Sequence, residues 1–304
     1  MKKPSQTSSQ LTGMGFLLTA TLIYSFFGVL SRLIGFQIPL FYLTGLRSLF
    51  AALLLVIVLA RNKEWKHLNR QELFWVLIRS AFGILAIITF FIAVNFLAIG
   101  TVYFIFYAGS TLGGYILGKI LFKESLTRIK ILSLGLSLFG LCLIYSVAID
   151  STLTLYAILS LVSGLATAAW NTFPKKIRHH YSAFQLTFLD NFCGAAIALI
   201  ISLALQEQWT VPNLSMPWGL NALFASLFIA TGWLVVNGFR RLDAQIGSLV
   251  MLSEALFAVI LGFLLYQETI APLTVVGGVV ILFAIILPEY KAVRTLLQPF
   301  IRNR

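Results

Sequence analysis

The feature that most constrains the fold is a succession of apolar runs, each of about twenty residues. About 20 apolar residues let a helix cross the hydrocarbon core of a bilayer. Because the connections between the runs are short, neighbouring helices should be antiparallel, and no connection could form a soluble domain. We therefore predict an all-α membrane protein with ten transmembrane helices. The expected helices cover residues 13–31, 39–60, 73–94, 101–122, 130–148, 154–173, 183–204, 218–237, 244–265 and 272–288.

The composition supports a lipid-facing surface. Hydrophobic residues make up 59% of the chain and charged residues 11%, whereas soluble domains contain about 25% charged residues. The net charge of +12 does not indicate a nucleic-acid partner, because the basic residues form small clusters between apolar runs. The first apolar run, 11–30, is followed by more of the same kind, which favours an uncleaved first helix over a signal peptide.

The basic clusters alternate along the chain and predict its orientation. Eighteen Lys and Arg residues fall in the two ends of the chain and in the connections after the second, fourth, sixth and eighth runs. Among the remaining connections, only the one after the first run has a basic residue, Arg32. Since positive loops remain in the cytoplasm, both termini should be cytoplasmic. We expect a multi-pass protein of the cell membrane, most simply a bacterial inner membrane.

The two halves of the chain share short matching segments. Residues 43–47 (LTGLR) match 186–190 (LTFLD) at an offset of 143, and residues 118–124 (GKILFKE) match 262–268 (GFLLYQE) at an offset of 144. Each half holds five expected helices, and an odd number makes the halves insert in opposite orientations. Inverted repeats are typical of alternating-access carriers, whose substrate site lies near the membrane midplane between the repeats.

This organisation predicts four parts. A cytoplasmic tail covers residues 1–12 and a first five-helix repeat covers 13–149. A second five-helix repeat covers 150–289, and a cytoplasmic tail covers 290–304.

The matching segments 118–124 and 262–268 each run from a glycine to a glutamate at the end of an expected helix. With these segments and Leu252–Gly262 (LSEALFAVILG), the chain resembles the EamA-like ten-helix transporters of the drug/metabolite transporter superfamily. The resemblance covers nearly the whole chain and implies a carrier of amino acids, metabolites or toxic compounds, often by export. One departure is that Ala255 stands where the family often has proline after the glutamate, and Thr111 stands at the equivalent position of the first half. A mechanism that needs proline kinks in these two helices therefore does not carry over.

Three charged residues lie deep within the expected helices: Arg47, Asp190 and Glu254. A charge at the bilayer centre costs roughly 2.5–3.5 kcal/mol on insertion scales, so each needs a partner, a water-filled cavity or a function. Arg47 and Asp190 occupy equivalent repeat positions. One interpretation is an ion pair that fixes two helices, for instance Arg47 with Glu254, and the other is a substrate site or proton relay. Arg79, six residues into its helix, could serve the site or reach the headgroups.

The chemistry of these residues suggests roles. Arg47 presents a fork of donors suited to a carboxylate or phosphate. Glu254 or Asp190 could bind an ammonium group, or take up a proton because burial disfavours a charged carboxylate. One arginine and one acid would suit a zwitterion such as an amino acid. Tyr107 and Trp233 lie deeper than interfacial anchors and are further candidates for the site. Weaker aromatic and amide candidates are Tyr24, Tyr103, Trp170 and Asn171.

Other functional classes lack their sequence signatures. The histidines lie in basic loops, no metal-ligand spacing occurs, and no ATP or dinucleotide glycine motif is present, so we expect no enzyme, cofactor or metal site. A non-transporting scaffold or receptor remains the main alternative. The expected partners are a small-molecule solute, the lipid bilayer and protons as a coupling ion, with the chain as a monomer or homodimer. Glycines four apart, as in 109–113 and 114–118, predict close helix packing.

Overall fold

The computed structural model describes residues 6–34, 38–67, 69–97, 99–145, 153–177, 181–267 and 269–290, and within these residues every regular element is a helix. The first half contains α1 (Gln6–Ile34), α2 (Leu40–Asn62), α3 (Arg70–Phe96), α4 (Ile99–Leu121) and α5 (Arg128–Ile144). The second half contains α6 (Thr154–Thr172), η2 (Phe173–Lys175), α7 (Ala183–Ala204), α8 (Met216–Phe239), α9 (Ala244–Met251), α10 (Ser253–Tyr266), α11 (Pro272–Ile286) and η3 (Leu287–Glu289).

The observed helices follow the predicted apolar runs, but the ninth run is interrupted and the last helix is shorter than a full membrane span. The ninth run is interrupted at Leu252, where α9 ends and α10 begins. In the described residues, eight helical stretches, with α9 and α10 taken together, are long and apolar enough to cross a membrane. The last helix, α11, has 15 residues and is about 23 Å long, shorter than the hydrocarbon core of about 30 Å. The prediction of ten crossings is thus supported in part.

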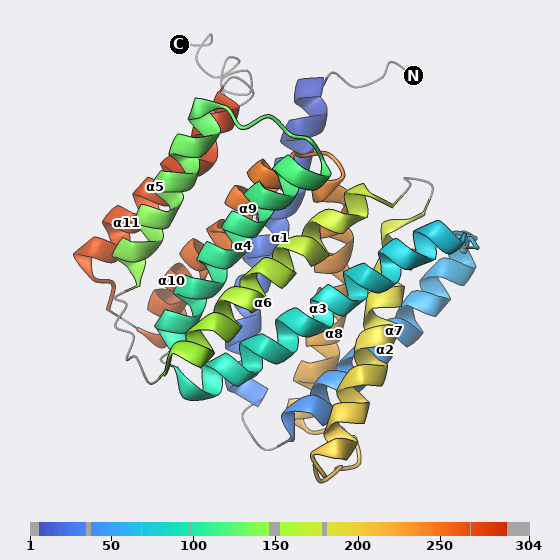
Figure 1. The fold of residues 1–304 in the computed structure, drawn as a ribbon. Coiled ribbons are helices and arrows are strands. Elements are labelled where there is room, and N and C mark those ends of the chain that lie inside the picture. Colours follow the sequence, from blue (N-terminus) through green and yellow to red (C-terminus); the bar gives the residue numbers. More distant parts are fainter. Residues whose placement is uncertain are drawn as a thin grey trace, which may run out of the picture.

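Helix packing follows the predicted repeat. Helix α1 packs along α8 and against α10 (Figure 1). Its counterpart α6 packs in the same way along α3 and against α4, which are the counterparts of α8 and α10. The pairs α2 with α7 and α5 with α11 each join equivalent helices of the two halves. Exchanging the halves therefore reproduces the main helix contacts, as expected of two repeats of the same fold.

The backbone conformation also repeats between the two halves. Four described non-glycine residues have a positive φ: Lys63 and Gln206, which are 143 positions apart, and Lys123 and Gln267, which are 144 apart. Each follows the end of a helix, where a left-handed residue redirects the chain. These separations equal the offsets of the sequence matches. The two halves therefore end corresponding helices with the same strained turn.

Two of the glutamates that follow these turns, Glu124 and Glu207, cap helices of the other half. Glu207 accepts hydrogen bonds from the backbone N–H groups of Phe41 (3.2 Å) and Tyr42 (2.8 Å), at the start of α2. Glu124 accepts from the N–H groups of Ala244 (2.7 Å) and Gln245 (3.3 Å), at the start of α9. A carboxylate at a helix N-terminus satisfies free N–H groups and interacts favourably with the helix dipole. The repeated Glu thus joins the halves. Glu268 lies outside the described residues.

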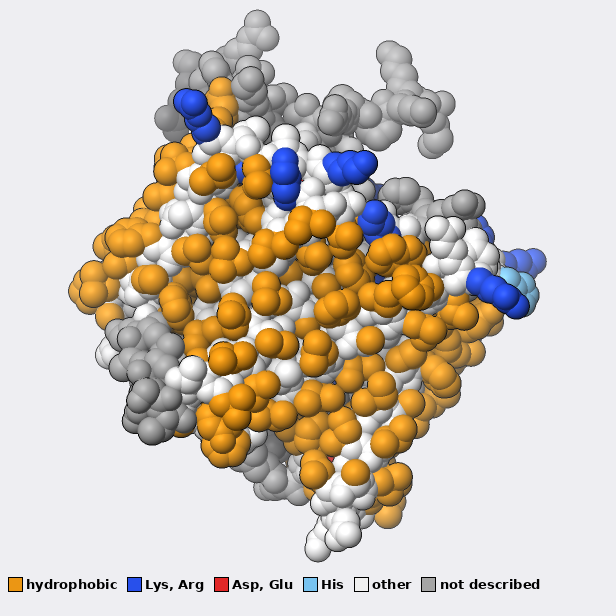
Figure 2. All heavy atoms as spheres, in the orientation of Figure 1, with side chains coloured by type: hydrophobic (Ala, Val, Ile, Leu, Met, Phe, Trp, Pro, Cys, Tyr) orange, Lys and Arg blue, Asp and Glu red, His pale blue; other side chains and the backbone are white. Residues whose placement is uncertain are grey.

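One end of the bundle is basic. Helix α1 begins and α11 ends there (Figure 1), and Lys and Arg side chains gather there above a broad hydrophobic face (Figure 2). We call this the basic end. Among its described residues are Lys123, Arg128, Lys130, Lys175, Lys176, Arg240 and Arg241. The side chain of Arg32 lies outside the described residues.

Glycines lie where several helices approach closely. A Cβ at Gly114 of α4 would lie 1.7 Å from Ser248 Oγ of α9, and one at Gly109 would lie 2.8 Å from the Leu161 carbonyl oxygen of α6. Between α5 and α11, a Cβ at Gly140 would lie 2.9 Å from the Gly277 carbonyl oxygen. These contacts leave no room for a larger residue, so small residues let the backbones approach, as expected from the spacing.

We expect Gly114→Leu to reduce the yield and melting temperature of purified protein in detergent, because a side chain there overlaps Ser248. Gly135→Leu on α5 is the matched control, since a Cβ at Gly135 meets nothing within 4 Å. Size-exclusion profiles and thermal melting measure both. A Gly114→Leu protein that is produced and melts like Gly135→Leu would contradict the proposed crossing.

Candidate functional site

A cavity of about 440 Å³ lies among helices of both halves. Its size is within the range of pockets that hold small organic ligands. Its walls come from α1, α3, α4, α6, α8, α9 and α10, and from Leu252 between the last two. The lining positions lie in the later part of α1 and α3 and the earlier part of α4. The cavity therefore extends from the middle of the bundle toward the end opposite the basic end.

Aromatic side chains dominate the walls. The aromatic lining residues are Tyr24, Phe27, Phe90, Phe91, Tyr103, Phe106, Tyr107, Trp170 and Phe228. Their rings support each other: Phe90 packs edge-on against Tyr103 and Phe106, and Tyr103 stacks on Tyr107 at 5.8 Å. Neutral polar groups come from Ser31, Ser110, Ser163, Thr167, Asn171 and Ser248. The cavity can thus enclose an apolar body and offer a few hydrogen bonds to it.

Glu254 enters the cavity just after the interruption between α9 and α10. The backbone tightens there, because the N–H of Ala255 bonds the carbonyl of Leu252 at 3.1 Å, an i to i+3 bond rather than an α-helical one. Ser253 Oγ donates to the Val250 carbonyl (2.8 Å) and shares a hydrogen bond with Thr21 Oγ1 of α1 (2.7 Å). These bonds fix the interruption against α1 without a proline, and so direct Glu254.

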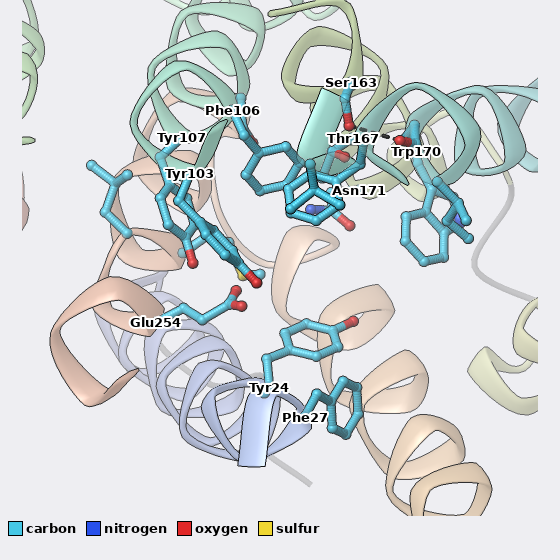
Figure 3. Close-up of a pocket in the computed structure, with 18 of the residues that line it drawn as sticks. Tyr24, Phe27, Tyr103, Phe106, Tyr107, Ser163, Thr167, Trp170, Asn171 and Glu254 are labelled. Carbon is cyan, nitrogen blue, oxygen red and sulfur yellow. Dashed lines mark hydrogen bonds between the residues drawn. The ribbon is translucent and has the colours of Figure 1, made fainter. Parts of the chain in front are cut away.

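Glu254 is the one charged side chain among the described residues that line the cavity. The hydroxyl groups of Tyr103 and Tyr107 point toward its carboxylate, and Tyr24 projects from the same side as Glu254 (Figure 3). No described Lys or Arg lies within 4 Å of this carboxylate. Among the described residues, the site therefore presents a carboxyl group surrounded by rings, with no basic side chain paired to it.

Arg79 and Asp190 lie behind the aromatic wall rather than in the cavity. They form an ion pair between α3 and α7, with side chains 3% and 9% exposed. Ser80 Oγ (2.9 Å) and Trp170 Nε1 (3.1 Å) also donate to the Asp190 carboxylate, and Arg79 Nε donates to the Trp170 carbonyl (3.1 Å). Because Trp170 lines the cavity, we infer that the pair positions this ring.

Arg47 and Trp233 are likewise outside the cavity lining. The guanidinium of Arg47 lies over the Phe224 ring, 4.0 Å from its centroid, and Nη2 donates a long hydrogen bond to Thr44 Oγ1 (3.4 Å). The ion pair considered between Arg47 and Glu254 is not formed. Trp233 packs edge-on against Phe16 at 5.3 Å. Of the candidate residues, the cavity brings together Glu254, Tyr107, Tyr24, Tyr103, Trp170 and Asn171.

Several lining residues were not identified from the sequence. Phe90 and Phe106 stand in apolar runs, where nothing distinguishes a cavity-facing ring from a lipid-facing one. Ser163 and Thr167 are four residues apart on α6, and this polar stripe in an apolar helix was a usable signal.

At the basic end, ion pairs join the two halves. Lys175 Nζ donates to Glu124 (2.6 Å) and to the Leu242 carbonyl (2.8 Å), and Lys130 Nζ donates to Asp243 (2.7 Å). Gly118 makes room for Glu124, because a Cβ there would lie 2.5 Å from its Oε2. These contacts join the end of α4, the start of α5 and η2 to the turn before α9. They lie opposite the end toward which the cavity extends.

A family model decides what kind of protein has this architecture. The model of the EamA-like transporter family matches residues 11–146 and 154–288, one copy on each half. The chain belongs to the EamA-like transporter family. With its apolar helices, this makes it a multi-pass membrane protein of a family that transports small solutes across membranes.

Solved structures support the fold of this EamA-like protein. One crystal structure, described only as that of a protein, matches with a TM-score of 0.78 and 13% sequence identity. The match covers 93% of this chain and 98% of the other, and at this identity it shows the fold alone. A comparison with curated protein sequences finds no significant match.

The buried pair makes a prediction about stability. Asp190→Asn should lower the melting temperature in detergent, because removing one partner of a buried pair leaves an uncompensated charge and costs about 3–5 kcal/mol. The double variant Arg79→Leu, Asp190→Leu should recover much of this loss. Thermal melting of the purified variants measures both. If Asp190→Asn melts at the wild-type temperature, the pair does not hold α3 against α7.

Proposed function

We propose that this protein is a secondary transporter that moves a small organic solute across the cytoplasmic membrane by alternating access, with the solute held in the aromatic cavity. The observation that carries the proposal is a cavity at the junction of the two repeats, with one carboxyl group in its wall that has no basic partner among the described residues. Carriers built from inverted repeats bind substrate at this junction. The substrate-binding residues in this proposal are Glu254, Tyr107, Tyr103 and Tyr24.

The proposed topology has ten crossings in two five-helix repeats, residues 13–149 and 150–289, with both termini in the cytoplasm. The basic end then faces the cytoplasm, as positive loops do. On this orientation the described conformation is open toward the outside, and the contacts of Lys175 with Glu124 help to close the cytoplasmic side. A bacterial inner membrane is the proposed location.

Glu254 is the proposed coupling group. A carboxylate in an apolar cavity can be neutralised by a proton or by a positive group of the solute, but one carboxylate does not hold both at once. Occupancy by one would therefore exclude the other, which couples solute movement to proton movement in the opposite direction. An amino acid fits this scheme if its ammonium group meets Glu254 and neutral donors such as Asn171 receive its carboxylate.

A cavity-filling substitution tests the site. Gly28 lines the cavity and a Cβ there meets nothing within 4 Å, so Gly28→Trp should fill the cavity without disturbing the fold. Gly15→Trp on the same helix is the matched control, since Gly15 is also open but exposed outside the cavity. Liposomes loaded with a mixture of amines, amino acids and other small organic solutes are assayed for efflux by mass spectrometry.

Wild type and Gly15→Trp should release at least one solute, and Gly28→Trp should release it at a rate reduced about tenfold or more while melting normally. Efflux of nothing by wild type would oppose transport and favour the scaffold or receptor alternative. Equal efflux by Gly28→Trp would show that the solute takes another route.

Coupling is tested separately. With wild type, an imposed proton gradient should drive the solute against its concentration gradient, and a pH dye inside the liposomes should report proton movement during flux. Glu254→Gln cannot exchange a proton, so it should lose both the driven uptake and the dye signal. Proton-driven accumulation that persists in Glu254→Gln would exclude this residue as the coupling group.

A further inference from the structure

Resting on the proposed function, we infer that the transported solute is a monovalent organic cation with an aromatic or bulky apolar body. The cavity pairs one carboxylate with nine aromatic rings and has no described basic residue in its lining. This combination distinguishes solutes by charge more than by detailed shape.

The charge balance of the site carries the inference. The other described membrane-buried acid, Asp190, is neutralised by Arg79, and Glu124 at the basic end is neutralised by Lys175. Glu254 has no such partner among the described residues. Since an isolated charge in a low-dielectric site is costly, the ligand that best stabilises this cavity is one that brings a single positive charge.

The surrounding rings strengthen the preference for a cation. The faces of tyrosine and tryptophan rings attract organic cations, and ammonium groups in aromatic cages are bound in this way. Tyr103 and Tyr107 direct their hydroxyls toward Glu254, and Tyr24, Phe106 and Trp170 line the same space (Figure 3). A positive head beside Glu254 would therefore leave its apolar body against rings.

The same geometry disfavours anions and zwitterions. Two described arginines of the membrane helices do not line the cavity: Arg79 is paired with Asp190, and Arg47 lies over Phe224. Among the described lining residues, a solute carboxylate would find only neutral donors, such as Asn171, Ser163 and Thr167, to replace its hydration. Losing that hydration without a charged partner costs free energy that a simple amine does not pay.

Matched probes test the charge preference. Phenethylamine, phenylalanine and 3-phenylpropionate share a ring and differ in charge, and phenyltrimethylammonium differs from tert-butylbenzene by its fixed positive charge. Their binding to purified full-length protein is measured by thermal stabilisation and calorimetric titration. The same probes are then offered to proteoliposomes. Glu254→Gln removes the charge with little change of shape, and Glu64→Gln removes a charge outside the cavity.

Phenethylamine should bind at least about tenfold more tightly than phenylalanine, a difference of 1.4 kcal/mol. Phenyltrimethylammonium should stabilise the protein whereas tert-butylbenzene should not, and Glu254→Gln but not Glu64→Gln should abolish this difference. Equal or tighter binding of phenylalanine or 3-phenylpropionate, or cation binding that survives in Glu254→Gln, would overturn the inference. So would no binding of any probe.

These failures are distinct from failure of the proposed function. If phenylalanine binds best and is transported, and Gly28→Trp blocks it, the cavity still serves transport and only the cation preference falls. If the cations bind but no probe crosses the membrane in either direction, the charge preference stands and the transport proposal falls.

Discussion

The cost of placing charge in an apolar helical bundle explains the ion pairs that join distant elements of this protein. Among the described residues, Asp190 is met by Arg79, Glu124 by Lys175, and Asp243 by Lys130. Each pair joins elements that are distant in sequence, so electrostatic neutrality and helix packing are satisfied together. Glu254 has no such partner among the described residues, and it enters a cavity of about 440 Å³ that leaves space for a ligand. That exception connects the fold to its proposed function.

The repeat explains how one chain supplies both the cavity and the contacts at the basic end. Equivalent helices meet as pairs, and left-handed turns followed by glutamates recur at the same offsets in both halves. The halves nevertheless differ chemically at the site. Asp190 stands where the first half has Arg47, and the acid at the interruption of the second half, Glu254, faces tyrosines of the first. The two halves thus share a backbone arrangement but place different side chains at the site. This difference lets the site distinguish one charge from another.

Much of the fold could be predicted from the sequence because hydrophobic length and charge alternation are local signals. The ninth helix was an exception: no proline or glycine marks Leu252, and its tightened turn depends on the contact of Ser253 with Thr21 of α1. The site was predictable only in part. Glu254 and Tyr107 were identified by depth, but the partner of Asp190 depends on how α3 packs on α7, which no spacing within either helix encodes. The roles of Phe90 and Phe106 were hidden because lipid-facing and cavity-facing rings look alike in sequence.

The central claim is that Glu254 is the group that exchanges a proton for a cationic solute. The most direct measurement is an infrared difference spectrum of the purified protein, recorded on adding phenyltrimethylammonium at a series of pH values. At pH values where the carboxyl is protonated, the account predicts loss of a protonated carboxyl signal on binding. That signal should be absent from Glu254→Gln. Persistence of the signal in Glu254→Gln, or cation binding with no carboxyl change at any pH, would contradict it.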